Sequence, residues 1–224
     1  KKRALMQLIY KFISWLFVPL MMPVYTLAVM FFTETVSKTS IDIKENPFLM
    51  NPYLKMVTLI IFFILLVIAP GLSLVIMQKN RQIESIELNN RRERSIPILI
   101  TGFYSFVLTI ILFKQLSILY FPVIIHSIAV LGVVSSFVAF IITLRTKISL
   151  HALASGLSAG TMIYYFYYFY IPDIIVLLAV ILTGGLVMTA RYGLKKHTIN
   201  QLISGYLIGL LLSFITLTIV KTLL

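Results

Sequence analysis

The chain has no cysteine and few charged residues, and each shortage removes whole classes of function. No Cys occurs among its 224 residues, which excludes disulfides, thiolate metal centres, covalent haem attachment and a cysteine nucleophile. Charged residues make up only 12% of the chain, whereas soluble domains carry about 25%. What the chain has in abundance is apolar: 60% of its residues are hydrophobic and its mean hydropathy is +1.02. Most of its surface must therefore face lipid.

Apolar runs of membrane-spanning length follow one another along the whole chain. A transmembrane helix needs about 20 predominantly apolar residues. Seven runs approach or exceed that length, at residues 12–32, 56–77, 96–113, 122–144, 148–170, 174–190 and 202–220. The sequence therefore predicts a single integral membrane domain over residues 1–224, an all-α polytopic transmembrane helical bundle of about seven spans with the lipid bilayer as its partner.

Basic residues gather at one end of the predicted spans, which we call the cationic face. Seven crossings place there 14 of the 19 Lys and Arg residues: Lys1, Lys2, Arg3, Lys11, Lys79, Arg81, Arg91, Arg92, Arg94, Arg145, Lys147, Arg191, Lys195 and Lys196. The positive-inside tendency makes this face cytoplasmic, in a membrane that we expect to be the bacterial inner membrane. These cations suit anionic lipid head groups or a phosphorylated substrate, and we expect no nucleic acid partner.

Three segments bring polar chemistry to the cationic face, and pairs of spans separate them. Their candidate residues are Arg91 and Arg94 before the third span, Lys147, Ser149 and His151 at the fifth, and Arg191 and His197 between the sixth and seventh. Guanidinium groups bind phosphoryl oxygens bidentately, and an imidazole can attack phosphorus or protonate a leaving alkoxide. The pattern favours phosphoryl transfer without a metal or cofactor; the alternative is that these cations only set topology and anchor lipids.

The spacing of the last segment resembles a family motif. Five residues separate Arg191 from His197, and three separate His197 from Gln201. This spacing resembles the third motif of the type 2 phosphatidic acid phosphatase superfamily, which reads Ser-Arg, five residues, His, three residues, Asp. The run Ser149-Leu150-His151 resembles its second motif, Pro-Ser-Gly-His. The resemblance extends from about residue 91 to residue 224.

This resemblance implies a membrane phosphatase with a six-helix core that hydrolyses a lipid phosphate or pyrophosphate through a phosphohistidine intermediate. It implies no metal and no cofactor. His197 would be the nucleophile and His151 the general acid. The phosphate-binding residues would be Arg191, Ser149, Lys147, and Arg94 or Arg91 from a first motif in which the family has a Lys and an Arg-Pro pair.

Three departures from the family pattern support a second hypothesis. Gln201 replaces the carboxylate that orients the nucleophilic histidine, Leu150 replaces a glycine, and Ala190 replaces a serine. A glutamine carbonyl can accept the ring N–H but brings no charge; Glu84, Glu87 and Glu93 are candidate substitutes on the same face. The alternative is a catalytically impaired relative that binds anionic lipid or serves as a membrane partner protein. Bacterial family members commonly expose this site to the exterior, opposite to the side that the charge count indicates.

Three other patterns in the sequence bear on function and packing. A small transporter needs polar residues at mid-membrane, and the chain offers few beyond His126, the pair Ser135–Ser136 and Thr183. The aromatic run at 164–170 predicts a belt at the membrane interface. Glycine pairs four residues apart, at 156 and 160 and at 205 and 209, predict close helix contacts.

Overall fold

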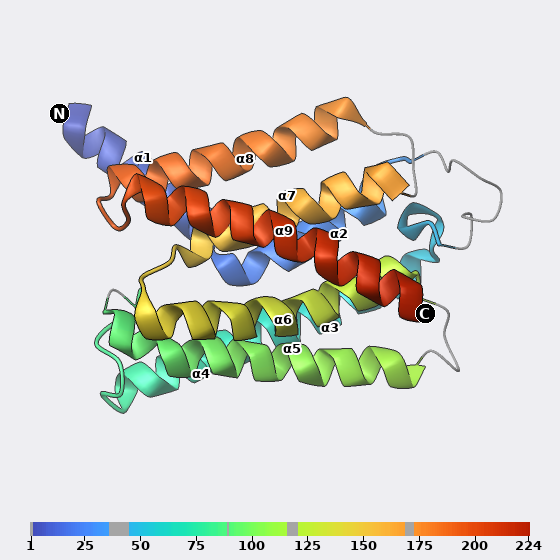
Figure 1. Ribbon diagram of the computed structural model, residues 1–224, viewed down its shortest axis with the longest axis horizontal. Coiled ribbons are helices and arrows are strands. Elements are labelled where there is room, and N and C mark those ends of the chain that lie inside the picture. Colours follow the sequence, from blue (N-terminus) through green and yellow to red (C-terminus); the bar gives the residue numbers. More distant parts are fainter. Residues whose placement is uncertain (1, 36–44, 89, 116–120, 169–172) are drawn as a thin grey trace.

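The computed structural model describes residues 2–35, 45–88, 90–115, 121–168 and 173–224. Within these ranges the secondary structure is helical and contains no strand, which confirms the predicted all-α fold. The elements are α1 (Lys2–Leu16), η1 (Pro19–Met21), α2 (Met22–Phe32), η3 (Pro47–Leu49), α3 (Pro52–Phe63), η4 (Ile64–Ile68), α4 (Ala69–Lys79), η5 (Arg91–Arg94), α5 (Ser95–Gln115), α6 (Val123–Arg145), α7 (Leu150–Tyr168), α8 (Ile174–Gly193) and α9 (Ile199–Leu223). The long helices run side by side along one direction (Figure 1).

Among the described residues, 5 helices are long and apolar enough to cross a membrane: Pro52–Lys79, Arg91–Lys114, Val123–Arg145, Ile174–Gly193 and Ile199–Leu223. The helical pair Lys2–Leu16 and Pro19–Phe32, bent by 41°, makes up to 6 if it counts as one span. Several side-by-side helices with apolar surfaces of this length are typical of an integral membrane protein.

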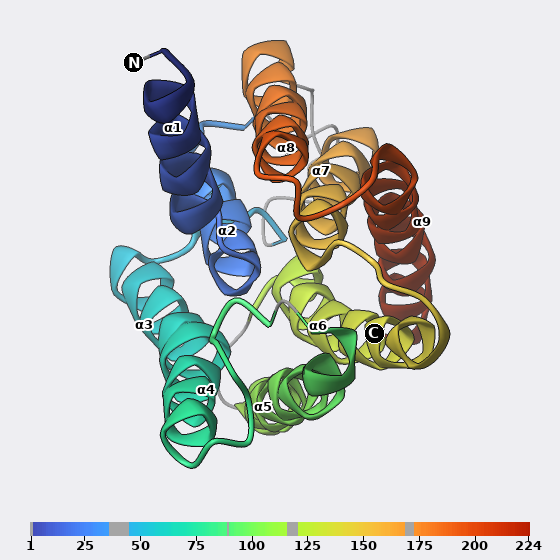
Figure 2. The ribbon, with the colours of Figure 1, turned by 90° about the vertical axis from the view of Figure 1, so that its left-hand side faces the viewer.

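The fifth predicted span, residues 148–170, corresponds to α7, which is not among the helices counted above. It lies in the middle of the bundle between α8 and α9 on one side and α2 and α6 on the other (Figure 2). Its first half is rich in glycine, alanine and serine, so it is less apolar than the helices that face lipid. Small residues let neighbouring helices approach closely. The enclosed position explains why α7 does not need a strongly apolar surface.

Glycines hold α7 against α9, as their spacing predicted. A Cβ added at Gly160 would lie 2.8 Å from the Leu210 carbonyl oxygen, and one added at Gly205 would lie 3.0 Å from the Ser149 oxygen. Both distances are shorter than ordinary contacts of a side-chain carbon. The start of α9 is thereby held next to the start of α7, where the two candidate histidines lie.

The predicted aromatic belt is wrong for most of its described residues. Tyr164, Tyr165 and Phe166 are buried in the core beside Phe31, whereas Tyr167 is 66% exposed. Residues 169–172 lie outside the described part of the chain. Because the helix is enclosed as far as Phe166, the rings of Tyr164, Tyr165 and Phe166 pack against other helices and not against the bilayer surface.

The break in the first span has a local cause. Val18 is extended, Pro19 follows it, and Pro23 opens α2. Proline cannot donate a backbone hydrogen bond, and it disfavours helical backbone at the residue before it. The chain therefore leaves the helix after Leu16 and starts again near Pro19.

The helices alternate in direction, so the ends predicted to share the cationic face do so. The beginnings of α1, α5, α7 and α9 and the ends of α4, α6 and α8 lie together at the left of Figure 1 and face the viewer in Figure 2. The segments that carry the candidate residues are therefore neighbours in space.

Candidate functional site

Two guanidinium groups are buried at the cationic face. Arg94, at the end of η5, is 4% exposed, and Arg191, in the last turn of α8, is 6% exposed. Arg94 donates from Nε to the Leu88 carbonyl at 2.7 Å and from Nη1 to the Ile148 carbonyl at 3.0 Å. Among the described residues, the Arg191 Nε is buried without a hydrogen-bond partner. Because an unsatisfied buried donor is costly, the Arg191 Nε can take a hydrogen-bond acceptor that the described residues do not supply.

His197 lies next to this pair, in the connection between α8 and α9. It is buried, and its Nδ1 lies 3.2 Å from Oε1 of Gln201. The same Oε1 accepts a hydrogen bond from the Thr198 backbone N–H at 3.3 Å. A backbone N–H can only donate, so the oxygen of the amide is the atom that faces both groups. His197 therefore donates from Nδ1, and its Nε2 carries the free lone pair.

The electrostatic surroundings of His197 keep it neutral. Its pKa is lowered to about 4; burial is the main cause, the hydrogen bond with Gln201 opposes it, and the charges of the surrounding cations add to it. Those cations are Arg191, Arg94 and Lys147. At neutral pH the imidazole is therefore unprotonated at Nε2, which is the state that a nucleophile requires.

The start of α9 explains the position of Gln201. Thr198 is the N-cap, its hydroxyl accepts from the Gln201 N–H, and the Gln201 side chain accepts in return from the Thr198 N–H. This is a capping box, a common way to satisfy the free N–H groups of a helix start. One glutamine thus caps α9 and holds the ring of His197.

His151 lies in the first turn of α7 and contacts the end of α1. Its Nε2 is 3.1 Å from the Ser14 carbonyl oxygen. The helix stops after Leu16, so this carbonyl belongs to the last turn, where intrahelical donors run out. A carbonyl can only accept, so His151 donates from Nε2.

Ser149 and Lys147 precede α7 on the same side of the bundle. Ser149 is fully buried, and its hydroxyl oxygen accepts from the Ala152 N–H at 3.3 Å. Burial and the charges of Arg94, Lys196 and Arg191 lower the pKa of the Lys147 ammonium. Lys147 thus lies within reach of the two buried guanidinium charges, and Ser149 directly follows Ile148, whose carbonyl accepts from Arg94.

Of the two arginines proposed from the first segment, Arg94 joins the cluster. Its charge acts on His151, His197 and Lys147. Arg91 instead donates to the Leu144 carbonyl at the end of α6 at 3.0 Å. The geometry therefore selects Arg94 as the better placed of the two candidates.

The acidic residues considered as substitutes for the family carboxylate take other partners. Glu87 forms an ion pair with Lys196 at 2.7 Å, and its charge reaches Arg191. Glu93 accepts from the Glu84 N–H at 3.0 Å. The hydrogen-bond acceptor that faces His197 is thus the amide of Gln201.

The cluster that results consists of Arg94, Lys147, Ser149, His151, Arg191, His197 and Gln201 at one membrane face. Within the described ranges, no group of three or more His, Cys, Asp or Glu residues could hold a metal ion. The sequence does not indicate the Ser14 carbonyl, because any residue type supplies a carbonyl. The Thr198 cap was missed although the pattern Thr-x-x-Gln predicts a capping box.

Comparisons of the chain with protein-family models, curated proteins and solved structures found no match.

Proposed function

We propose that this protein is a metal-independent membrane phosphatase that hydrolyses a lipid phosphate or pyrophosphate through a phosphohistidine intermediate, in a bacterial inner membrane. The observation that carries the proposal is the buried Nε of Arg191, which has no partner among the described residues, beside a neutral His197. Buried guanidinium groups without a carboxylate partner suit a phosphoryl group, whose oxygens they bind bidentately.

The first step uses the free lone pair of His197. Nε2 attacks phosphorus, a P–N bond forms, and the bond from phosphorus to the lipid oxygen breaks. The negative charge of the bound phosphate favours protonation of His151 at its second nitrogen, Nδ1. His151 gives this Nδ1 proton to the leaving alkoxide while its Nε2–H stays on the Ser14 carbonyl, so the lipid departs as an alcohol and the ring ends neutral. During this transfer, charge spreads over the phosphoryl oxygens, which Arg94 and Arg191 stabilise.

The second step regenerates the enzyme. A water molecule gives a proton to the now neutral His151 and attacks phosphorus, and the P–N bond breaks. Inorganic phosphate leaves, and both imidazoles return to their starting states. No redox partner and no metal ion takes part in either step.

A second candidate function rests on one specific feature. Gln201 supplies no negative charge to stabilise a His197 that becomes cationic on attack, and changes from carboxylate to amide in catalytic triads cost about 10⁴-fold in rate. If this loss is not compensated, the same cationic pocket binds anionic lipid without hydrolysing it. The Arg94 and Arg191 contacts to phosphate are common to both functions.

The experiment that separates the two measures phosphate release by the purified protein in detergent, with a chelator present. Phosphatidate, a polyprenyl pyrophosphate and a phosphatidylglycerol phosphate serve as substrates. We expect release of inorganic phosphate, and its loss in His197→Gln. The matched control is His126→Gln, because His126 is buried beside Phe113 and Phe121 at the other end of the bundle.

Two results would decide against catalysis by His197. Release that survives His197→Gln would remove the nucleophile from the proposal. No turnover with any of the substrates, together with saturable binding of phosphatidate that Arg191→Ala abolishes, would establish the second candidate.

A further inference from the structure

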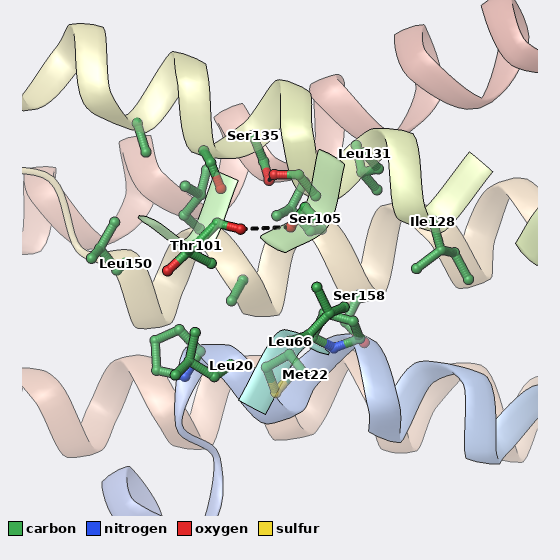
Figure 3. A pocket seen from close by; sticks show the side chains of 18 of the residues that line it. Leu20, Met22, Leu66, Thr101, Ser105, Ile128, Leu131, Ser135, Leu150 and Ser158 are labelled. Atoms are coloured by element: carbon green, nitrogen blue, oxygen red, sulfur yellow. Dashed lines mark hydrogen bonds between the residues drawn. The ribbon is translucent and has the colours of Figure 1, made fainter. Parts of the chain in front are cut away.

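A cavity lies inside the bundle, beyond the candidate site. It has a volume of about 140 Å³, is partly open, and is lined by η1, the beginning of α2, α5, α6 and α7, and by Leu66 of η4 (Figure 3). Its wall includes Leu20, Ile98, Ile128, Leu131, Leu150 and Leu157. The cavity is therefore an apolar space within the membrane region of the protein.

One end of the cavity adjoins the cationic cluster. Leu150, which lines it, stands between Ser149 and His151 in the sequence. Ile98 also lines it and lies one helical turn beyond Arg94. Leu20 reaches it directly after the break that brings the Ser14 carbonyl to His151. Residues close in sequence to Arg94 and to the Ser149–His151 segment thus belong to the cavity wall.

The other end lies deep in the bundle. Along α7 the wall runs from Leu150 to Thr161, which corresponds to about 16 Å of helix. Thr161 is close to α9, because its hydroxyl donates to the Ser213 hydroxyl at 3.4 Å. The cavity therefore extends from the cationic face toward the middle of the membrane.

The hydroxyl groups in the wall offer little to a polar ligand. The Thr101 hydroxyl donates to the Pro97 carbonyl at 3.0 Å, and the Ser105 hydroxyl donates to the Thr101 carbonyl at 2.9 Å (Figure 3). Thr26 donates in the same way to the carbonyl of Met22, four residues earlier. Donors already bonded to their own helix leave mostly carbon surface facing the cavity, which suits an apolar ligand.

We propose that this cavity takes one hydrocarbon chain of the lipid whose phosphate binds at the cationic cluster. The inference rests on the proposed function and deepens it, because it places the tail of the substrate inside the protein and not in the surrounding bilayer. When the hydrocarbon chain leaves the bilayer and binds in the apolar cavity, the whole lipid is held in one orientation. This orientation aligns the phosphorus with His197. Substrates with a long chain are therefore selected over short ones.

The test fills the cavity and follows both binding and turnover. Ala154 lines the cavity and is 8% exposed, so Ala154→Phe places a ring in the path of the chain. The matched control is Ala179→Phe, on the exposed side of α8. Hexadecyl phosphate with a diazirine on its chain, photoactivated in detergent, reports which residues the chain touches. Butyl phosphate serves as the short substrate.

We expect the diazirine to label cavity residues of α5, α6 and α7 in the wild type and in Ala179→Phe, but not in Ala154→Phe. We also expect Ala154→Phe to lower kcat/KM for hexadecyl phosphate by about tenfold or more, the scale of one well-fitted apolar contact, and to leave butyl phosphate hydrolysis unchanged. Thermal melting in detergent checks that both variants are folded.

The outcomes separate this inference from the proposed function. Labelling confined to the lipid-facing surface, with hexadecyl phosphate still hydrolysed and Ala154→Phe without effect, would overturn the cavity proposal alone. Labelling of the cavity without phosphate release from any substrate would overturn catalysis and keep the cavity as a chain-binding site. Equal loss of both substrates in a folded Ala154→Phe would show a general disturbance of the site and would also count against the cavity.

Discussion

The Oε1 atom of Gln201 accepts a hydrogen bond from Nδ1 of His197 and another from the Thr198 N–H, which caps the start of α9. The orientation of the candidate nucleophile is thus tied to the cap of α9. In the superfamily that the sequence resembles, a carboxylate holds this position. The glutamine keeps the geometry and the tautomer but omits the charge, so the effect of charge alone can be measured at this site.

The first prediction concerns Gln201→Glu. Glutamate has the same shape and also closes a capping box, so α9 stays intact. A carboxylate would stabilise the positive charge that His197 gains on attack, and we expect kcat for phosphatidate to rise by about tenfold or more. The measurement is steady-state phosphate release, with Gln201→Ala as the variant that loses both roles. A folded Gln201→Glu protein with lower kcat would show that charge at this position does not assist the reaction.

The second prediction concerns pH. The pKa of His197 is about 4 in the fold, against an ordinary value of 6.5. The unfolded chain therefore binds a proton that the folded chain does not, and stability falls as the pH drops from 6.5 toward 4. We expect the melting temperature in detergent to fall less over this interval in His197→Gln than in the wild type. Parallel pH curves for the two proteins would contradict the lowered pKa.

The third prediction tests the close packing of α9 on α7 at Gly209. A Cβ at Gly209 would lie 2.7 Å from the Leu157 nitrogen, whereas a Cβ at Gly185 would meet nothing within 4 Å. We expect Gly209→Ala to destabilise the fold by about 1–3 kcal/mol through overpacking. Gly185→Ala, the control, should be neutral or slightly stabilising, because alanine favours helix over glycine by about 1 kcal/mol. Thermal melting measures both, and equal melting temperatures would disprove the close contact.

The fourth prediction concerns the side of the membrane that the candidate site faces. Single introduced cysteines can report it, because the chain has no cysteine. Asn200 is exposed at the cationic face, and Tyr53 is 74% exposed at the opposite end. From the positive-inside tendency we expect Asn200→Cys to be protected from a membrane-impermeant thiol reagent in intact cells and Tyr53→Cys to react. The reverse pattern would place the candidate site on the exterior, as is common in bacterial members of the superfamily.

The helical fold was predictable because few backbone conformations can satisfy all their hydrogen bonds inside a bilayer. Long apolar runs must satisfy their backbone groups internally, so the spans at 56–77 and 202–220 correspond to helices with only their ends shifted. The first span was less predictable. Its apolar run begins at residue 12, yet α1 begins at Lys2. The first part of α1 is amphipathic, so it forms a helix without the continuous apolar run that marks a span.

The site was predictable in its membership more than in its contacts. An even number of spans between the segments was enough to place Arg94, His151 and His197 at one face. Their hydrogen bonds could not be read from spacing, since the carbonyl of Ser14 is a backbone group that any residue would supply. The aromatic run misled for a related reason: its pattern suits a membrane interface, but tertiary position decides whether Tyr165 meets lipid or protein.

The interruption at Pro19 brings the first helical pair into contact with the candidate site. Had the helix continued without a break, the Ser14 oxygen would bond to a backbone N–H four residues later, and His151 would have lost its acceptor. A proline outside the motif segments therefore determines the hydrogen bonding of His151, the proposed general acid. Exchanging this segment for another hydrophobic anchor would preserve the topology of the chain while removing that hydrogen bond.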